Sequence, residues 1–197
     1  MDHPTVSPNR TISITEIFMQ DNTVSQSPDA IKTMDLETLE FARKVFQLVR
    51  NGDAEMLEIY LSRGLPANLS NHKGDSLLML ASYHGHLDAT RVLLSHGADP
   101  EMRNDQGQTP LAGAAFKGDI PMLELLLDHG ADVDGTTSDG KTGLMFAAMF
   151  NRLDAVKFLI GRGADIGARA ASGLNAHDAA SSMGAADTAA HLMAVAR

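Results

Sequence analysis

The sequence predicts an all-α solenoid, in which short helix-turn-helix units repeat and stack side by side. Nearly the same nine residues, LLSHGADPE, LLDHGADVD and LIGRGADIG, begin at Leu93, Leu126 and Leu159, which sets a repeat of 33 residues. Three series of glycines follow the same interval, and a fixed period of this length is typical of repeat architectures. Apolar residues make up 44% of the chain and include much Ala, Leu and Met, which favours closely packed helices over strands.

The three glycine series divide each unit into its parts. The first series ends one short helix and turns the chain into the next, and the second follows the apolar end of that next helix. Glycine suits these positions because it enters the left-handed conformation without a steric penalty. The third series lies between polar residues, as in NDQGQT, and predicts the tip of a tight turn. The series are Gly52, Gly85, Gly118, Asn151 (in place of glycine) and Gly184; Gly64, Gly97, Gly130 and Gly163; and Gly74, Gly107, Gly140 and Gly173.

The first helix of a unit is expected to begin directly after the turn, at Ser76, Thr109 or Thr142. A side-chain oxygen suits an N-cap, and Pro110 fixes φ in the first turn of its helix. Small pairs such as Ala114-Ala115 then let neighbouring units approach closely. The second helix carries RVLL, ELLL or KFLI, whose leucines are expected to face a core shared by neighbouring units.

The unit resembles the ankyrin repeat. Its best copy, GQTPLAGAAFKGDIPMLELLLDHGADVD, runs from Gly107 to Asp134, and the resemblance covers residues 39–197. It implies an ankyrin repeat solenoid of paired antiparallel helices with projecting β-turn loops, as in small stand-alone ankyrin repeat proteins. The histidine of the family's TPLH signature helps to tie neighbouring turns together, but other residues stand in its place, so the turns are expected to be less rigid. These residues are Met79, Ala112, Met145 and Asp178.

The first and last copies depart from the pattern, as terminal caps must, because each faces water on one side. In the first copy, the helix is expected to start near Asp35. Residues 1–34 are polar and lack the period, which predicts a disordered tail, although TISITEIFMQ is apolar enough to bind a groove, its own repeats or a partner. The expected ankyrin repeat domain, residues 35–197, comprises an N-terminal cap (35–74), three full repeats (75–107, 108–140 and 141–173) and a C-terminal cap (174–197).

Candidate binding residues follow from the resemblance. In ankyrin stacks, the two positions before the first-series glycine end the inner helix and face a concave groove. In this chain most of these positions hold large apolar side chains, which favours a recognition surface. The alternative is that some of them, Phe150 above all, pack sideways against the next repeat. The expected contacts are Tyr83, His84, Phe116, Lys117, Met149, Phe150 and Met183.

The turn tips form a second set of candidate contacts. Their side chains carry charges of both signs, which would set the register of a partner more than the strength of binding. The alternative for any single one of them is a solvated turn residue. The set comprises His72, Lys73, Asp75, Arg103, Asp105, Gln106, Gln108, Ser138, Asp139 and Lys141.

Composition and spacing disfavour other classes of function. The formal net charge of −9 argues against nucleic acid as a partner, because an acidic surface repels phosphate. No run of 18 apolar residues predicts a membrane span, and no export signal is apparent, so the expected location is cytoplasmic. The eight histidines lack the spacing of a metal site, and Ser70, His72 and Asp75 lack the setting of a catalytic triad. We therefore expect no catalytic, metal-binding or cofactor-binding residues.

The resulting hypothesis is a non-catalytic protein, monomeric when free, that binds another protein through its concave groove and turn tips. It would act as an inhibitor or immunity-type protein that masks an enzyme, or as an accessory protein that stabilises one. The acidic surface would suit a basic target. Two alternatives stay open, namely a structural or self-assembling scaffold unit and, less favoured, an enzyme or small-molecule binder.

Overall fold

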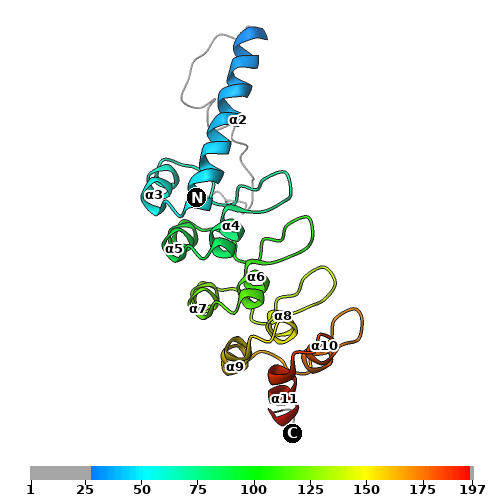
Figure 1. Ribbon diagram of the computed structural model, residues 1–197. Coiled ribbons are helices and arrows are strands. Elements are labelled where there is room, and N and C mark those ends of the chain that lie inside the picture. Colours follow the sequence, from blue (N-terminus) through cyan, green and yellow to red (C-terminus); the bar gives the residue numbers. More distant parts are fainter. Residues whose placement is uncertain (1–27, 196–197) are drawn as a thin grey trace, which may run out of the picture.

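The computed structural model describes residues 28–195, with side-chain surroundings from residue 38 onward. Over this range the chain forms ten helices in five consecutive pairs, which confirms the expected all-α solenoid (Figure 1). The first helix of each pair lies in an inner row beside the projecting loops, and the second lies in an outer row. The inner row is α2 (Pro28–Asn51), α4 (Leu77–His84), α6 (Pro110–Lys117), α8 (Gly143–Met149) and α10 (Ala176–Ser182). The outer row is α3 (Ala54–Ser62), α5 (Leu87–Ser95), α7 (Ile120–Asp128), α9 (Leu153–Gly161) and α11 (Ala186–Val195).

The first helix is longer than the sequence predicted. α2 begins at Pro28, seven residues before the expected start at Asp35, so residues 28–34 belong to the helix and not to the tail. Proline suits the first turn of a helix because its fixed φ is helical and its missing N–H would have no partner there. The rest of the expected tail, residues 1–27, lies outside the described residues.

The predicted N-caps of the inner helices are confirmed. In Ser76, Thr109 and Thr142, the side-chain oxygen accepts a hydrogen bond from the backbone N–H three residues later, at 3.0, 3.2 and 3.3 Å. In the last repeat Asn175 takes this position and forms a capping box with Asp178. Each inner helix from α4 to α10 therefore starts at a residue whose side chain satisfies one of the free N–H groups.

The projecting loops are tied to one another through their backbones, although the family's histidine is missing. The N–H of Ser138 donates to the carbonyl of Gly107, in the preceding loop, at 3.2 Å. The same link joins the loops on either side, from Asp105 to Lys73 at 3.1 Å and from Ala171 to Asp139 at 2.9 Å. The loops therefore form a connected edge along the inner row of helices.

The core lies between the two rows and between successive pairs. Four leucines at the same position of successive outer helices are fully buried, namely Leu93, Leu126, Leu159 and Leu192. On the inner helices, Ala115 and Ala148 are also fully buried. Their small side chains let α6 approach α8 and α8 approach α10, so each inner helix packs on the next. The core is therefore continuous along the stack, as expected for a solenoid.

Candidate partner-binding groove

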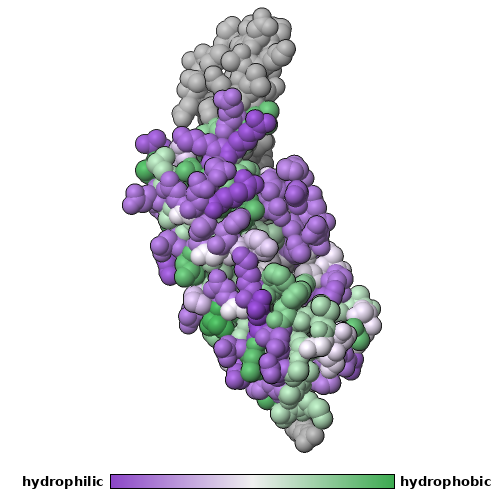
Figure 2. Space-filling view, in the orientation of Figure 1, coloured by the Kyte–Doolittle hydropathy of each residue, from purple (hydrophilic) through white to green (hydrophobic). Residues whose placement is uncertain are grey.

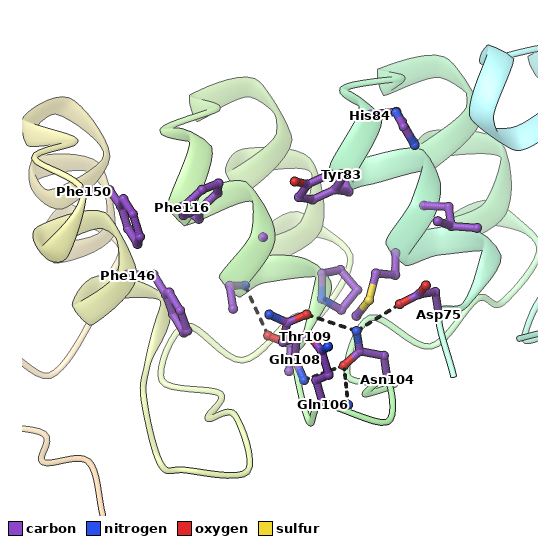
Figure 3. A pocket seen from close by; sticks show the side chains of 15 residues that line it. Asp75, Tyr83, His84, Asn104, Gln106, Gln108, Thr109, Phe116, Phe146 and Phe150 are labelled. Carbon is purple, nitrogen blue, oxygen red and sulfur yellow. Dashed lines mark hydrogen bonds between the residues drawn. The ribbon is translucent and has the colours of Figure 1, made fainter. Parts of the chain in front are cut away.

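A groove runs along the inner helices α4, α6 and α8, where they meet the projecting loops (Figure 3). Its volume is about 570 Å³. Aromatic side chains of the helices form its floor, and polar side chains of the loops form one side. The aromatic residues are Tyr83, Phe116, Phe146 and Phe150, and the polar residues are Asp75, Asn104, Gln106 and Gln108.

The aromatic side chains of the floor are accessible and fixed in position. Tyr83 is 46% exposed and Phe150 is 36% exposed, whereas Phe116 and Phe146 are half-buried. Phe116 and Phe150 pack edge to face, with ring centroids 4.4 Å apart and ring planes at 78°. Such an edge-to-face pair contributes about 0.5–1.5 kcal/mol of stabilising free energy beyond that from burial of the rings. The floor thus combines exposed apolar area with ordered rings, as recognition surfaces do.

Gly113 leaves a notch in this floor. A Cβ atom placed on Gly113 would meet only the Cδ2 atom of Tyr83, at 3.7 Å. The equivalent positions of the neighbouring repeats hold Leu80 and Phe146, and all three residues line the groove. The notch therefore offers room for a side chain of a partner between Leu80 and Phe146.

Two basic side chains contact the ends of the inner helices at the side of the groove away from the loops. Lys117 Nζ lies 4.2 Å from the centroid of the Tyr83 ring and donates a hydrogen bond to the Tyr83 carbonyl oxygen. One repeat further along, Arg152 Nε donates to the Phe116 carbonyl oxygen at 3.1 Å. Both carbonyls belong to the last turn of a helix, where they lack an intrahelical partner and cations are favoured.

His84 lies beside Tyr83 and also lines the groove. Its ring meets the Tyr83 ring edge-on, with centroids 5.9 Å apart, and stacks on His86 at 6.0 Å. Burial is the first cause that lowers the pKa of His84, and the charges of His86, Lys117 and Arg50 lower it further. Lys117 and Arg50, two of the groups that lower this pKa, place positive charge near this side of the groove.

Asn104 organises the polar side of the groove. Its amide nitrogen donates to Asp75 Oδ1 at 2.9 Å and to Gln108 Oε1 at 3.1 Å. Its amide oxygen accepts from the backbone N–H groups of Gln106 and Gln108. The Gln106 side chain has no hydrogen-bond partner in the described part of the chain, so its amide can bind the backbone of a partner.

Comparison with protein-family models gives the family of the chain. The model for ankyrin repeats in three copies matches residues 45–137, 96–170 and 114–195. The chain belongs to the ankyrin repeat family. Ankyrin repeats are generally protein–protein interaction modules.

A curated relative of this ankyrin repeat protein comes from Pseudomonas aeruginosa and is named "Putative ankyrin repeat protein PA3287". The two sequences are 60% identical over 58 residues, which cover 29% of this chain and 34% of the relative. The match therefore spans about a third of the relative's length and supports the same family.

The groove of the ankyrin stack brings together seven of the predicted contact residues. They are Asp75, Tyr83, His84, Gln106, Gln108, Phe116 and Phe150. Lys117 adjoins them through its contact with Tyr83. His72, Lys73 and Asp105 line a second depression, of about 460 Å³, at the tips of two successive loops. Because Asp75, Gln106 and Gln108 line both cavities, the two sets of predicted contacts form one continuous surface.

The remaining predicted contacts lie outside both cavities. Met149 is half-buried, and Met183 is 53% exposed one repeat further along. In the third loop Lys141 forms an ion pair with Asp139, and this contact is the main cause that lowers the pKa of Asp139, followed by the hydrogen bond from Thr137. These charges are therefore engaged within their own loop. Besides Lys117, the predicted contacts that line neither cavity are Arg103, Ser138, Asp139, Lys141, Met149 and Met183.

Phe146 is the main groove residue that the repeat pattern did not predict. It lies four residues before Phe150, and residues at this spacing share one face of a helix. The four-residue spacing in the sequence could have identified Phe146 as a neighbour of Phe150. The aligned positions hold Leu80 and Gly113, so no common residue type marks this row of the groove.

Two classes of site were also sought across residues 28–195. No group of three or more His, Cys, Asp or Glu side chains in this range could hold a metal ion. None of the described helices is both long and apolar enough to cross a membrane.

Proposed function

We propose that this ankyrin repeat protein binds one segment of a partner protein in the groove and catalyses no reaction. The observation that carries the proposal is the accessible aromatic floor, which spans three successive inner helices and is bordered by polar loop side chains. Exposed aromatic residues in a cleft are typical of recognition surfaces. The carboxylate in the groove, Asp75, accepts hydrogen bonds from Asn71 and Asn104 and so holds the loops together, which argues against an acid–base role.

The energetics require more than the aromatic floor. Burying a large apolar side chain contributes about 1.5–3 kcal/mol, so three such residues contribute roughly 5–9 kcal/mol. Association costs about 4–15 kcal/mol before any net affinity appears. The floor alone would therefore bind weakly, and a firm complex also needs contacts from the loop side chains, such as the free amide of Gln106 and the charged tips around Lys73.

The proposed role is that of an inhibitor or immunity-type protein that masks an enzyme, or of an accessory protein that stabilises one. Both roles need a surface that covers a segment of another protein, which the groove and the loop tips together supply. The proposal keeps the cytoplasmic location expected from the sequence.

The test is capture of the partner by the full chain from a lysate of its source organism, with identification by mass spectrometry. The variant that combines Tyr83→Ala with Phe116→Ala is expected to bind the captured protein at least tenfold more weakly. Truncation of a central aromatic side chain in an interface commonly costs about 2 kcal/mol or more of binding free energy, as is typical of hot-spot residues. Titration calorimetry with the purified partner measures the change.

The matched control is Ile59→Ala, which removes an exposed apolar side chain from the outer helix α3. Its binding is expected to equal that of the wild type. Circular dichroism of each variant establishes that the stack is folded. Full binding by the double variant would refute the groove as the contact surface.

The alternative of a self-assembling unit is favoured by one observation, the apolar C-terminal end of the stack. Leu174, Met183, Met193 and Val195 are all exposed there, and hydrophobic residues gather over α8, α10 and α11 (Figure 2). We expect the free chain to sediment as a monomer at all concentrations. A sedimentation coefficient that rises with concentration would support self-assembly instead.

A further inference from the structure

The side of the groove away from the loops is basic, although the whole chain carries a net charge of −9. Three successive inner helices each end in or near a basic or imidazole side chain, and the N-cap of the outer helix α9 adds a fourth. These residues are Arg50 in α2, His84 in α4, Lys117 in α6 and Arg152 after α8, and we call them the basic edge. All four are exposed to solvent.

No carboxylate in the described part of the chain forms an ion pair with the basic edge. Lys117 and Arg152 instead donate hydrogen bonds to backbone carbonyls. Basic residues elsewhere do pair, as Arg162 does with Asp128 at 2.6 Å.

Two carboxylates that lie close to the basic edge in the sequence, Asp53 and Asp119, bind backbone N–H groups rather than its basic side chains. Asp53 accepts a hydrogen bond from the backbone N–H of Met56 at 3.1 Å, and Asp119 accepts one from that of Met122 at 3.2 Å. Both carboxylates therefore cap outer helices. Burial, followed by repulsion from His86, Lys117 and Arg50, lowers the pKa of His84, which agrees with a positive potential here.

The groove is thus polarised across its width. The basic edge lies on one side, the aromatic floor lies in the middle, and the polar loop residues lie on the other side. The loop side includes the Asp75 carboxylate and the Gln106 amide. Ions screen surface charges beyond about 8 Å at physiological salt, so the local edge acts on a bound segment more strongly than the distant acidic surface does.

We infer that the groove takes an acidic segment with apolar anchors from the partner protein, with its Asp and Glu side chains toward the basic edge and its apolar side chains on the aromatic floor. This inference rests on the proposed function and specifies the chemistry of the segment that the groove binds. The inferred partner segment is acidic, whereas the net negative charge of the chain suggests a basic target.

Selection of random twelve-residue peptides displayed on phage tests the inference. The full chain is the bait, and peptides that also bind the Tyr83→Ala, Phe116→Ala variant are discarded. The remaining peptides are expected to be enriched in Asp and Glu next to aromatic or aliphatic residues. Enrichment in Lys and Arg, or no bias in charge, would overturn the inference while leaving the proposed function intact. The absence of any groove-dependent peptide would count against both.

Charge reversal then tests the basic edge itself. The variant with Arg50→Glu and Arg152→Glu is expected to bind a selected acidic peptide about tenfold more weakly at 0.15 M salt, as measured by fluorescence polarisation. Arg91→Glu with Lys157→Glu is the matched control, because it makes the same change in net charge on the exposed surface of α5 and α9. Equal losses in both variants would assign the effect to total charge and overturn the inference. Circular dichroism excludes unfolding as the cause.

Discussion

Replacing Gly107 by Ala is expected to lower the free energy of unfolding by about 3 kcal/mol. Gly107 has a φ of 71°, a left-handed conformation that costs a residue with a side chain about 1–2 kcal/mol. A Cβ atom there would overlap Ser138 Oγ and would lie 2.5 Å from Ser138 Cβ and 2.8 Å from the Ser138 backbone nitrogen. The hydroxyl can rotate away, but the nitrogen is held by its hydrogen bond to the Gly107 carbonyl. The next loop must therefore move, which adds a cost of about 1–3 kcal/mol.

Gly97→Ala is the matched control for this substitution. Gly97 has a similar φ of 81°, but a Cβ atom there would meet no atom within 4 Å. Only the conformational cost applies, so we expect a loss of about 1–2 kcal/mol. Urea unfolding followed by circular dichroism measures both variants. Equal losses would mean that contact between neighbouring loops contributes little to the stability of the stack.

The fold was predictable because its local rules repeat in every unit. Caps, turns and the buried leucine position recur every 33 residues, so each copy tests the assignment made for the others. Asn151 illustrates this, because it was expected to replace a glycine and does adopt a left-handed φ of 54°. Its side chain also donates to Asp187 in the next repeat at 2.8 Å. The start of α2 was not predictable in the same way, because no second copy of residues 28–34 exists.

The groove was less predictable than the fold, because its residues need not repeat. Tyr83 and Phe116 occupy aligned positions and both line the groove. Met149 occupies the same position in the next repeat but does not line the groove, where Phe146 and Phe150 form the surface of α8 instead. An alignment of repeats compares equivalent positions, whereas the groove depends on which side chains are large enough to reach it.

The basic edge was only partly predictable from the repeat. His84 and Lys117 share one position of the 33-residue unit, whereas Arg50 and Arg152 occupy two other positions. Only the stacking of helix ends in space brings them to one side of the groove. The net charge therefore describes the solubility of the chain, whereas the arrangement of helix ends sets the local potential.

The second large effect is expected from the buried leucines of the outer helices. Leu126→Ala should lower the free energy of unfolding by about 2–5 kcal/mol, because Leu126 is fully buried and its removal leaves a cavity. α7 lies in the middle of the stack and packs against both α5 and α9. The loss is therefore expected to weaken interfaces on both sides, and to lower hydrogen-exchange protection across α4 to α9.

Leu192→Ala removes the same side chain from α11, at the C-terminal end of the stack. Leu192 is also fully buried, but α11 has no later helix in the described chain against which to pack. In a solenoid each unit is stabilised only by its neighbours, so the loss should stay local. We expect α10 and α11 to exchange their amide hydrogens faster, while α4 to α7 keep the protection of the wild type. Uniform loss of protection in both variants would instead show that the whole stack unfolds as one unit.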